Sequence, residues 1–135
     1  MFLNWNTIYS VNIKEFDSQH KKLFEIINNI YRLKQDPEKV GLIKAVNELE
    51  EYANYHLKRE EEVFEEYNYP EKENHLIFHE KYREKISEFK EKIENEDDLD
   101  KLIKELSLFL KDWWIKHIQN IDHQYTDFLN KKGLY

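Results

Sequence analysis

Three segments of the chain carry pairs of metal-binding residue types at helical spacing. The pairs are His56 with Glu60, His75 with His79, and His117 with Asp122. In an α-helix, side chains four residues apart lie one above the other on the same face, so such a pair can point at one spot. The repeated spacing therefore predicts that these segments are helices and that their paired side chains face a common interior.

A further histidine upstream, His20, brings the set to five imidazoles and two carboxylates. Seven donors are more than one transition-metal ion takes, but they suit two ions that share the carboxylates as bridges. The chain has no cysteine, which excludes disulfides, thiolate nucleophiles, zinc fingers and cysteine-ligated iron–sulfur clusters. The sequence thus predicts a dinuclear metal site held by His, Asp and Glu alone.

The rest of the sequence favours an all-α fold. Only two glycines and two prolines occur among 135 residues, so helices can run long, and β-branched residues do not alternate with polar ones. We expect a single domain over residues 1–135, folded as an up-down-up-down antiparallel four-helix bundle, with residues 1–17 as an extended arm over the bundle. The helices are expected at about 18–35, 38–67, 70–93 and 98–132.

Residues with strong positional preferences suggest where these helices begin. Asp17 or Ser18 is suited to cap the first helix, and Asp97 or Asp98 the fourth. Pro70 suits the first turn of the third helix.

The fourth helix contains one break in its pattern. The position after His117 on the buried face should be Ile121, but the matching residue is Asp122, five residues on and about 140° round an ideal helix. The apolar stripe resumes at Tyr125 and Leu129, as if one residue had been inserted. A π-bulge accommodates one extra residue, and π-bulges gather at functional sites. We therefore predict a wide helical turn between His117 and Asp122.

Glu60 distinguishes a metal site from an ordinary core. A single histidine on an apolar stripe is more often a hydrogen-bonded core residue than a ligand. A carboxylate on the buried face, however, costs several kcal/mol unless it is paired. Lys58 and Arg59 leave the helix in other directions, so an internal cation is the better partner for Glu60. A structural bundle with tolerated histidines does not explain this residue. His123 should point outward, because its neighbour Asp122 points inward.

The charge balance bears on partners and location. The formal net charge of -7 argues against nucleic acid as a partner, because phosphate recognition needs clustered Lys and Arg. No segment is apolar for the length of a membrane span, and the N-terminus lacks a basic region followed by an apolar run. We expect a cytoplasmic protein without a membrane span, and leave any protein partner open.

The ordered set H…HxxxE…HxxxH…HxxxxD resembles that of the hemerythrin family, and in particular its single-domain bacterial form. The similarity extends over nearly the whole chain, including the entry to the first helix, Asp17 to Lys21, and the stretch Trp113 to Ile118. Because the complete set has ordered spacings, the resemblance is highly specific.

The resemblance implies a diiron centre with an oxo or hydroxo bridge. One six-coordinate iron is expected on His75, His79 and His117, and the second on His20 and His56. Glu60 and Asp122 are expected to bridge the two ions. One coordination position then stays open on the second iron, where O2 binds as a hydroperoxide in this family.

The resemblance also implies a pocket wall and a function. Trp113 and Tyr125 match aromatic positions near the site, whereas Trp114 stands where many relatives have an aliphatic residue. We expect these three residues to line the pocket, and Trp114 to affect ligand access. The expected function is reversible O2 binding for storage, delivery or sensing, and not catalysis. The alternative is a diiron oxidase, a peroxidase or an enzyme that handles nitric oxide on the same scaffold.

Overall fold

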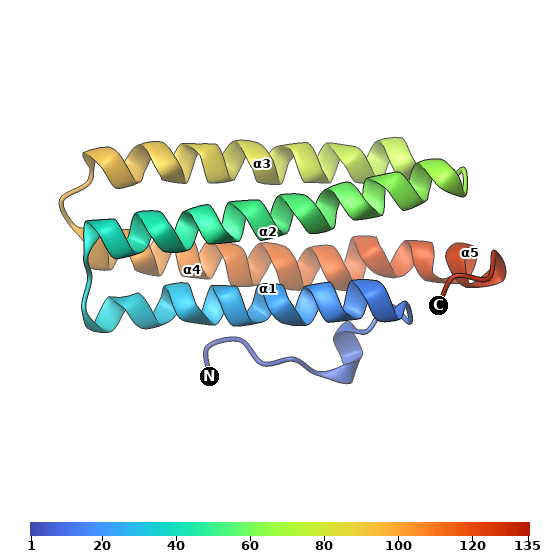
Figure 1. The fold of residues 1–135 in the computed structure, drawn as a ribbon, viewed down its shortest axis with the longest axis horizontal. Coiled ribbons are helices and arrows are strands. Elements are labelled where there is room, and N and C mark those ends of the chain that lie inside the picture. Colours follow the sequence, from blue (N-terminus) through green and yellow to red (C-terminus); the bar gives the residue numbers. More distant parts are fainter.

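Four amphipathic segments form the long helices of the protein, whose computed structural model describes all 135 residues. They are α1 (Lys14–Arg32), α2 (Lys39–Glu66), α3 (Lys72–Asn95) and α4 (Leu99–Lys116). Consecutive helices run antiparallel, and α4 lies against α1, so the bundle closes on itself (Figure 1). The predicted all-α fold, an up-down-up-down four-helix bundle, is confirmed.

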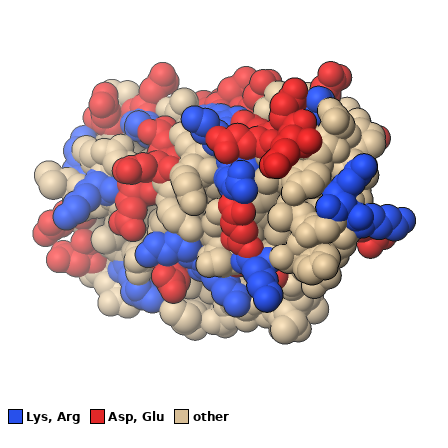
Figure 2. Space-filling view, turned by 45° about the vertical axis from the view of Figure 1, so that its right-hand side comes forward, with Lys and Arg blue, Asp and Glu red and all other residues tan.

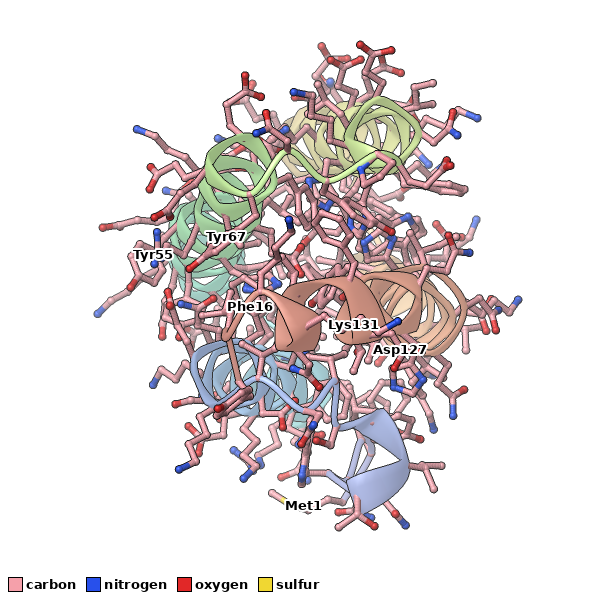
Figure 3. The ribbon with its side chains drawn as sticks, turned by 90° about the vertical axis from the view of Figure 1, so that its right-hand side faces the viewer. Met1, Phe16, Tyr55, Tyr67, Asp127 and Lys131 are labelled. Carbon is pink, nitrogen blue, oxygen red and sulfur yellow. The ribbon has the colours of Figure 1, made fainter.

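The apolar stripes of the four helices face one core. Seen along the bundle, Phe16 on α1 points to the interior, while Tyr55 on α2 points away from it (Figure 3). Full burial of a large apolar side chain contributes about 1.5–3 kcal/mol to stability relative to exposure. The largest buried side chains include an indole near the C-terminal end of α4, Trp114. This core fixes the faces on which the polar site residues lie.

The N-terminal arm covers residues 1–13 and packs on α1. It contains a short 3-10 turn, η1 (Thr7–Tyr9), and buries Leu3, Val11 and Ile13. The Asn28 side chain makes two hydrogen bonds to the backbone of one arm residue, Leu3. Its Oδ1 accepts the Leu3 N–H at 2.9 Å, and its Nδ2 donates to the Leu3 carbonyl at 2.8 Å.

The first helix begins at Lys14, four residues before the predicted start, and Ile13 precedes it without a side-chain cap. Asp17 lies inside the first turn and does not cap it. Its carboxylate accepts the Val11 N–H at 2.8 Å and the Ser10 hydroxyl at 2.6 Å. The residue therefore anchors the arm to the helix. A single 3-10 turn, η2 (Leu33–Gln35), continues α1 to the predicted end.

A side-chain cap and a turn set the starts of two other helices. Asp98 caps α4, as one of the two expected candidates, because its side chain accepts the Lys101 N–H at 3.1 Å. The third helix begins at Lys72, so Pro70 lies in the preceding turn and not in the first helical turn. Asn68 in this turn has a φ of 54°, a left-handed conformation that asparagine tolerates better than most residues. The chain reverses direction in this turn, which joins α2 to α3.

The predicted fourth helix, 98–132, consists of several pieces. After α4 come a π-helical turn, η3 (His117–Ile121), a 3-10 turn, η4 (Asp122–Tyr125), and α5 (Thr126–Lys131), which lies at the end of the bundle (Figure 1). Gly133, with a φ of 91°, ends α5. The interruption coincides with the two predicted ligands on this segment.

The outer surface carries charges of both signs. On the face shown in Figure 2, acidic and basic side chains alternate over the helices, and the basic ones form no continuous stripe. No helix combines the length and the apolar character that crossing a membrane requires.

Candidate metal centre

The structure brings all seven predicted ligands together inside the bundle. His20 comes from α1, His56 and Glu60 come from α2, and the remaining four come from α3 and the two turns that follow α4. All seven are at most 3% exposed. His75 and His79 lie on α3, His117 begins η3, and Asp122 begins η4.

The imidazoles form two groups of unequal size. His75, His79 and His117 share one set with Glu60, and His20 and His56 share another with Glu60 and Asp122. Within each set the candidate donor atoms lie within 4.8 Å of one another, the spacing of groups that can hold a metal ion. In all five rings Nε2 faces the carboxylates, so each Nδ1 is left for another partner.

The two carboxylates lie between these groups. Asp122 places Oδ1 at 3.0 Å from Nε2 of both His75 and His117, and Oδ2 at 3.2 Å from Nε2 of His20. Glu60 places Oε1 at 3.3 Å from Nε2 of His79 and 3.5 Å from Nε2 of His56. Each carboxylate therefore reaches both sets of imidazoles.

The wide turn explains how Asp122 reaches the cluster. With the π-helical turn from His117 to Ile121, residues five apart both face inward, and the predicted bulge is confirmed. Ile121 is half-buried and lines a surface cleft, and His123 is exposed as expected. In an unbroken α-helix Asp122 would lie about 140° round the axis from His117, about 100° further than a four-residue step.

Several polar atoms of the cluster have no hydrogen-bond partner. They belong to the carboxylates and to the imidazole nitrogens that face them: Glu60 Oε1, both Asp122 oxygens and His79 Nε2. A buried polar atom without a partner is costly, and a buried charge more so. The donors present, all imidazole nitrogen and carboxylate oxygen, fit transition-metal ions.

The protonation states fit the same conclusion. Burial raises the pKa of Glu60 and Asp122, but the surrounding imidazoles outweigh it and hold both pKa values well below their ordinary range. Burial lowers the pKa of His56 to about 3. Burial also lowers the pKa of His75, but the adjacent carboxylates of Asp122 and Glu60 prevail and raise it to about 9. In the metal-free protein a proton on His75 thus stands where a cation would bind.

Residues outside the predicted set hold two of the ligands. His56 Nδ1 lies 2.5 Å from Gln19 Oε1, and His79 Nδ1 lies 2.7 Å from Glu61 Oε2. Neither partner was predicted from the sequence. Each is adjacent to a ligand in the sequence, but which ring it meets depends on how α1, α2 and α3 are rotated against one another.

The predicted aromatic residues surround the cluster at different places. The Trp114 ring is fully buried, with its centroid 5.9 Å from that of His56 and 6.4 Å from that of His20. Tyr125 donates its hydroxyl to Glu60 Oε2 at 2.7 Å. Trp114 therefore covers the side with two imidazoles, and Tyr125 fixes a carboxylate.

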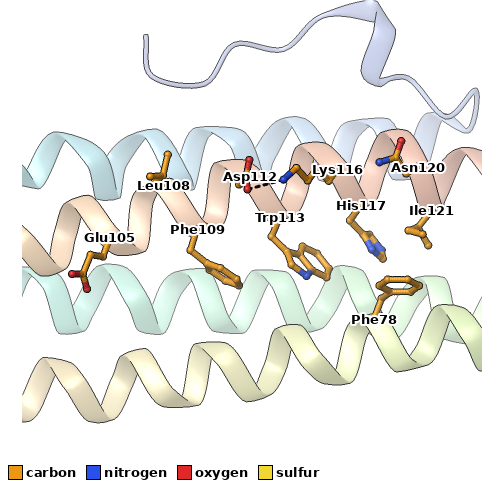
Figure 4. A pocket seen from close by; sticks show the side chains of 10 residues that line it. All are labelled: Phe78, Glu105, Leu108, Phe109, Asp112, Trp113, Lys116, His117, Asn120 and Ile121. Carbon is orange, nitrogen blue, oxygen red and sulfur yellow. Dashed lines mark hydrogen bonds and ion pairs between the residues drawn. The ribbon is translucent and has the colours of Figure 1, made fainter.

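Trp113 lies on the other side, against His117. The two rings stack with centroids 4.3 Å apart and an interplanar angle of 12°. Trp113 and Phe78 flank His117 in an open cleft of about 550 Å³ along α4 (Figure 4). The Lys116–Asp112 ion pair, at 3.0 Å, lies at the edge of this cleft. Trp113 thus shields one ligand from solvent.

The fold and the donors define a helical-bundle protein with His, Glu and Asp groups positioned to bind metal. Residues 11–129 match the family model described as the hemerythrin HHE cation binding domain. The chain belongs to the hemerythrin family.

Curated relatives and solved structures agree with this assignment. The chain is 32% identical to a bacteriohemerythrin of Clostridium acetobutylicum, over 91% of this chain and 98% of that protein. It is 29% identical to a bacteriohemerythrin of Pseudomonas aeruginosa, over 93% and 80%. The crystal structure of a wild-type hemerythrin superposes with a TM-score of 0.84 at 21% identity, covering 94% of this chain and 97% of that chain, which shows the shared fold.

Proposed function

We propose that this chain is a non-haem diiron protein that binds O2 reversibly, for storage, delivery or sensing. The observation that carries the proposal is the unequal division of five imidazoles around two shared carboxylates. One iron would be held by His75, His79 and His117 and the other by His20 and His56. Glu60 and Asp122 would bridge the two. The second iron then has one protein donor fewer, which leaves room for a ligand.

The charge of the donor set favours a carrier. Two ferrous ions bring four positive charges, and two carboxylates with one hydroxide offset three of them. When bound, the ions supply the electrons that O2 binding needs. Neutral imidazoles donate less negative charge than additional carboxylates would, so this set is less suited to driving O–O cleavage. The names of the bacterial relatives point to the same class of protein.

The chain supplies a dry and rigid surrounding for the ligand. Trp114 and Phe16, both fully buried, lie against His56 with ring centroids 5.9 Å away in each case. These rings exclude water from the side with two imidazoles. The hydroxyl of Tyr125 holds one oxygen of Glu60, which leaves Oε1 turned to the imidazoles.

Metal analysis and an oxygen cycle test this proposal. Iron-replete protein should contain two irons per chain. After anaerobic reduction, the colourless protein should gain colour with O2 and lose it again on purging with argon. One zinc per chain, or no iron, would contradict the diiron site. Stoichiometric conversion to diferric protein in one turnover, with product release, would favour the oxidase alternative.

A further inference from the structure

The two imidazoles with outer side-chain partners belong to different sets, and their partners differ in charge. His79, in the set of three, has Nδ1 at 2.7 Å from a carboxylate oxygen of Glu61. His56, in the set of two, has Nδ1 at 2.5 Å from the amide oxygen of Gln19. Since Nε2 of both rings faces the cluster, Nδ1 carries the proton and donates it to these oxygens.

An arginine pairs directly with Glu61, whereas Gln19 is held by Glu15, which is itself paired with an arginine. Arg83 Nη2 lies 3.1 Å from Glu61 Oε2, so the carboxylate is paired while it accepts from His79. On the other side, Gln19 Nε2 donates to Glu15 Oε2 at 3.3 Å, which fixes the amide with its oxygen towards His56. Glu15 in turn binds Arg59 Nε at 2.5 Å.

The charge of the acceptor changes how strongly an imidazole donates to a metal. A carboxylate that accepts from Nδ1–H draws the proton away from the ring and raises its basicity at Nε2 more than a neutral amide does. Stronger donation stabilises the ferric ion relative to the ferrous ion. The structure thus gives the set of three imidazoles the stronger donor and the set of two the weaker one.

We propose that Glu61 and Gln19 are positioning residues that make the two irons electronically different. Glu61 strengthens His79 and stabilises the ferric state of the iron in the set of three. Gln19 leaves His56 a weaker donor, so the iron with the free position resists oxidation. This inference rests on the proposed function, because it requires iron at both positions.

Redox titration of variants that exchange acid and amide at Glu61 and at Gln19 tests this proposal. Glu61→Gln should raise the midpoint potential, and the double variant Glu15→Gln with Gln19→Glu should lower it. The double variant moves one carboxylate to His56 while the net charge stays constant. We expect about a tenfold change in the ferric–ferrous equilibrium in each case, which is about 59 mV for one electron. The electron comes from a dithionite-reduced mediator, and the Nδ1 proton stays on the ring.

Proton NMR provides a second measurement beside the midpoint potentials. The exchangeable Nδ1–H resonances of the metal-bound histidines are shifted by the paramagnetic irons in proton NMR. The resonance of His79 should move in Glu61→Gln and that of His56 in the double variant. Glu61→Asp, which keeps the carboxylate, should restore most of the wild-type potential.

Two matched controls separate this effect from a general change in charge. Glu80→Gln removes an exposed carboxylate next to His79, and Glu15→Gln alone removes the outer acid without altering Gln19. Both should move the potential much less than the exchanges. Arg83→Met keeps Glu61 but removes its cation, so it should lower the potential, opposite to Glu61→Gln. This variant provides the test if Glu61→Gln folds poorly.

The outcomes distinguish this inference from the proposed function. Iron content is measured first in the wild-type protein, and absence of two irons would overturn the diiron proposal itself. If two irons are present but the exchanges shift the potential no more than the controls, or both shift it in one direction, the roles of Glu61 and Gln19 are refuted and the diiron site stands.

Discussion

At the scale of single residues, Glu60 has the largest number of roles in the cluster. Its Oε1 faces imidazoles of both sets and its Oε2 accepts from Tyr125. Glu60→Ala should therefore lose both irons and not only one, and Glu60→Gln, which keeps the shape, should bind iron more weakly. Iron analysis checks this. Glu62→Gln, on the exposed side of α2, is the matched control. Full iron and an unchanged spectrum in Glu60→Ala would refute the bridging role.

Trp114 lies where it can control access of O2. Its ring is fully buried and covers His20 and His56. Trp114→Leu opens space next to this pair, so we expect the O2 on-rate or the autoxidation rate to change more than the iron content. Stopped-flow mixing of the diferrous protein with O2 measures the first rate. Trp113→Leu serves as the comparison, because Trp113 stacks on His117. Unaltered rates for Trp114→Leu would show that O2 enters by another route.

Of the residues at the site, the ligands could be predicted from the sequence, but the residues that hold them could not. The seven candidate ligands could be predicted from the sequence, because their spacing places them on helical faces and a buried Glu60 requires a cation. The roles of Gln19 and Glu61 could not be predicted, since their partners belong to other helices. A stripe gives the direction of a side chain relative to its own helix axis. It does not give the rotation of one helix against the next.

At the scale of elements, the π-helical turn links the fold to the site. Inserting one alanine after Asn120 should rotate Asp122 by about 100° about the helix axis relative to His117. The variant should retain its helical circular dichroism while losing iron, because Asp122 no longer reaches His20, His75 and His117. Asn120→Ala, which keeps the chain length, should retain iron. Full iron in the insertion variant would contradict the role of the turn.

The residues at which the helices begin were harder to predict from the sequence than the faces that the helices bury. Asp98 caps α4 through a local hydrogen bond, which a sequence signal captures. Asp17 was expected as a cap for the same reason, but it binds the arm through Val11 and Ser10, so α1 starts at Lys14. Whether an acidic side chain caps a helix or binds a folded-back arm depends on tertiary structure, which the local sequence pattern does not contain.

At the scale of the whole molecule, the metal cluster should stabilise the fold. Two buried carboxylates and five buried imidazoles come from four different helical segments, so ions bound among them join all parts of the bundle. A metal that binds only the folded state adds its binding free energy to stability. We expect a higher melting temperature for the iron-loaded protein than for the metal-free protein in thermal unfolding. Equal melting temperatures would contradict this.

The size of that stabilisation should depend on pH through His75. In the metal-free protein its pKa is raised from 6.5 to about 9, so the stability gained from this proton is complete below pH 6.5 and is lost as the pH rises towards 9. Iron needs the neutral ring and must displace the proton, which becomes easier over the same range.

The difference in unfolding free energy between iron-loaded and metal-free protein should therefore be larger at pH 8 than at pH 6. Denaturant titrations of both forms at the two pH values measure it. In His75→Gln, which has no proton to displace, the metal-free protein should lose less stability between pH 6 and pH 8. A difference that stays constant or shrinks would show that the His75 proton does not compete with iron, and that the cation binds elsewhere in the cluster.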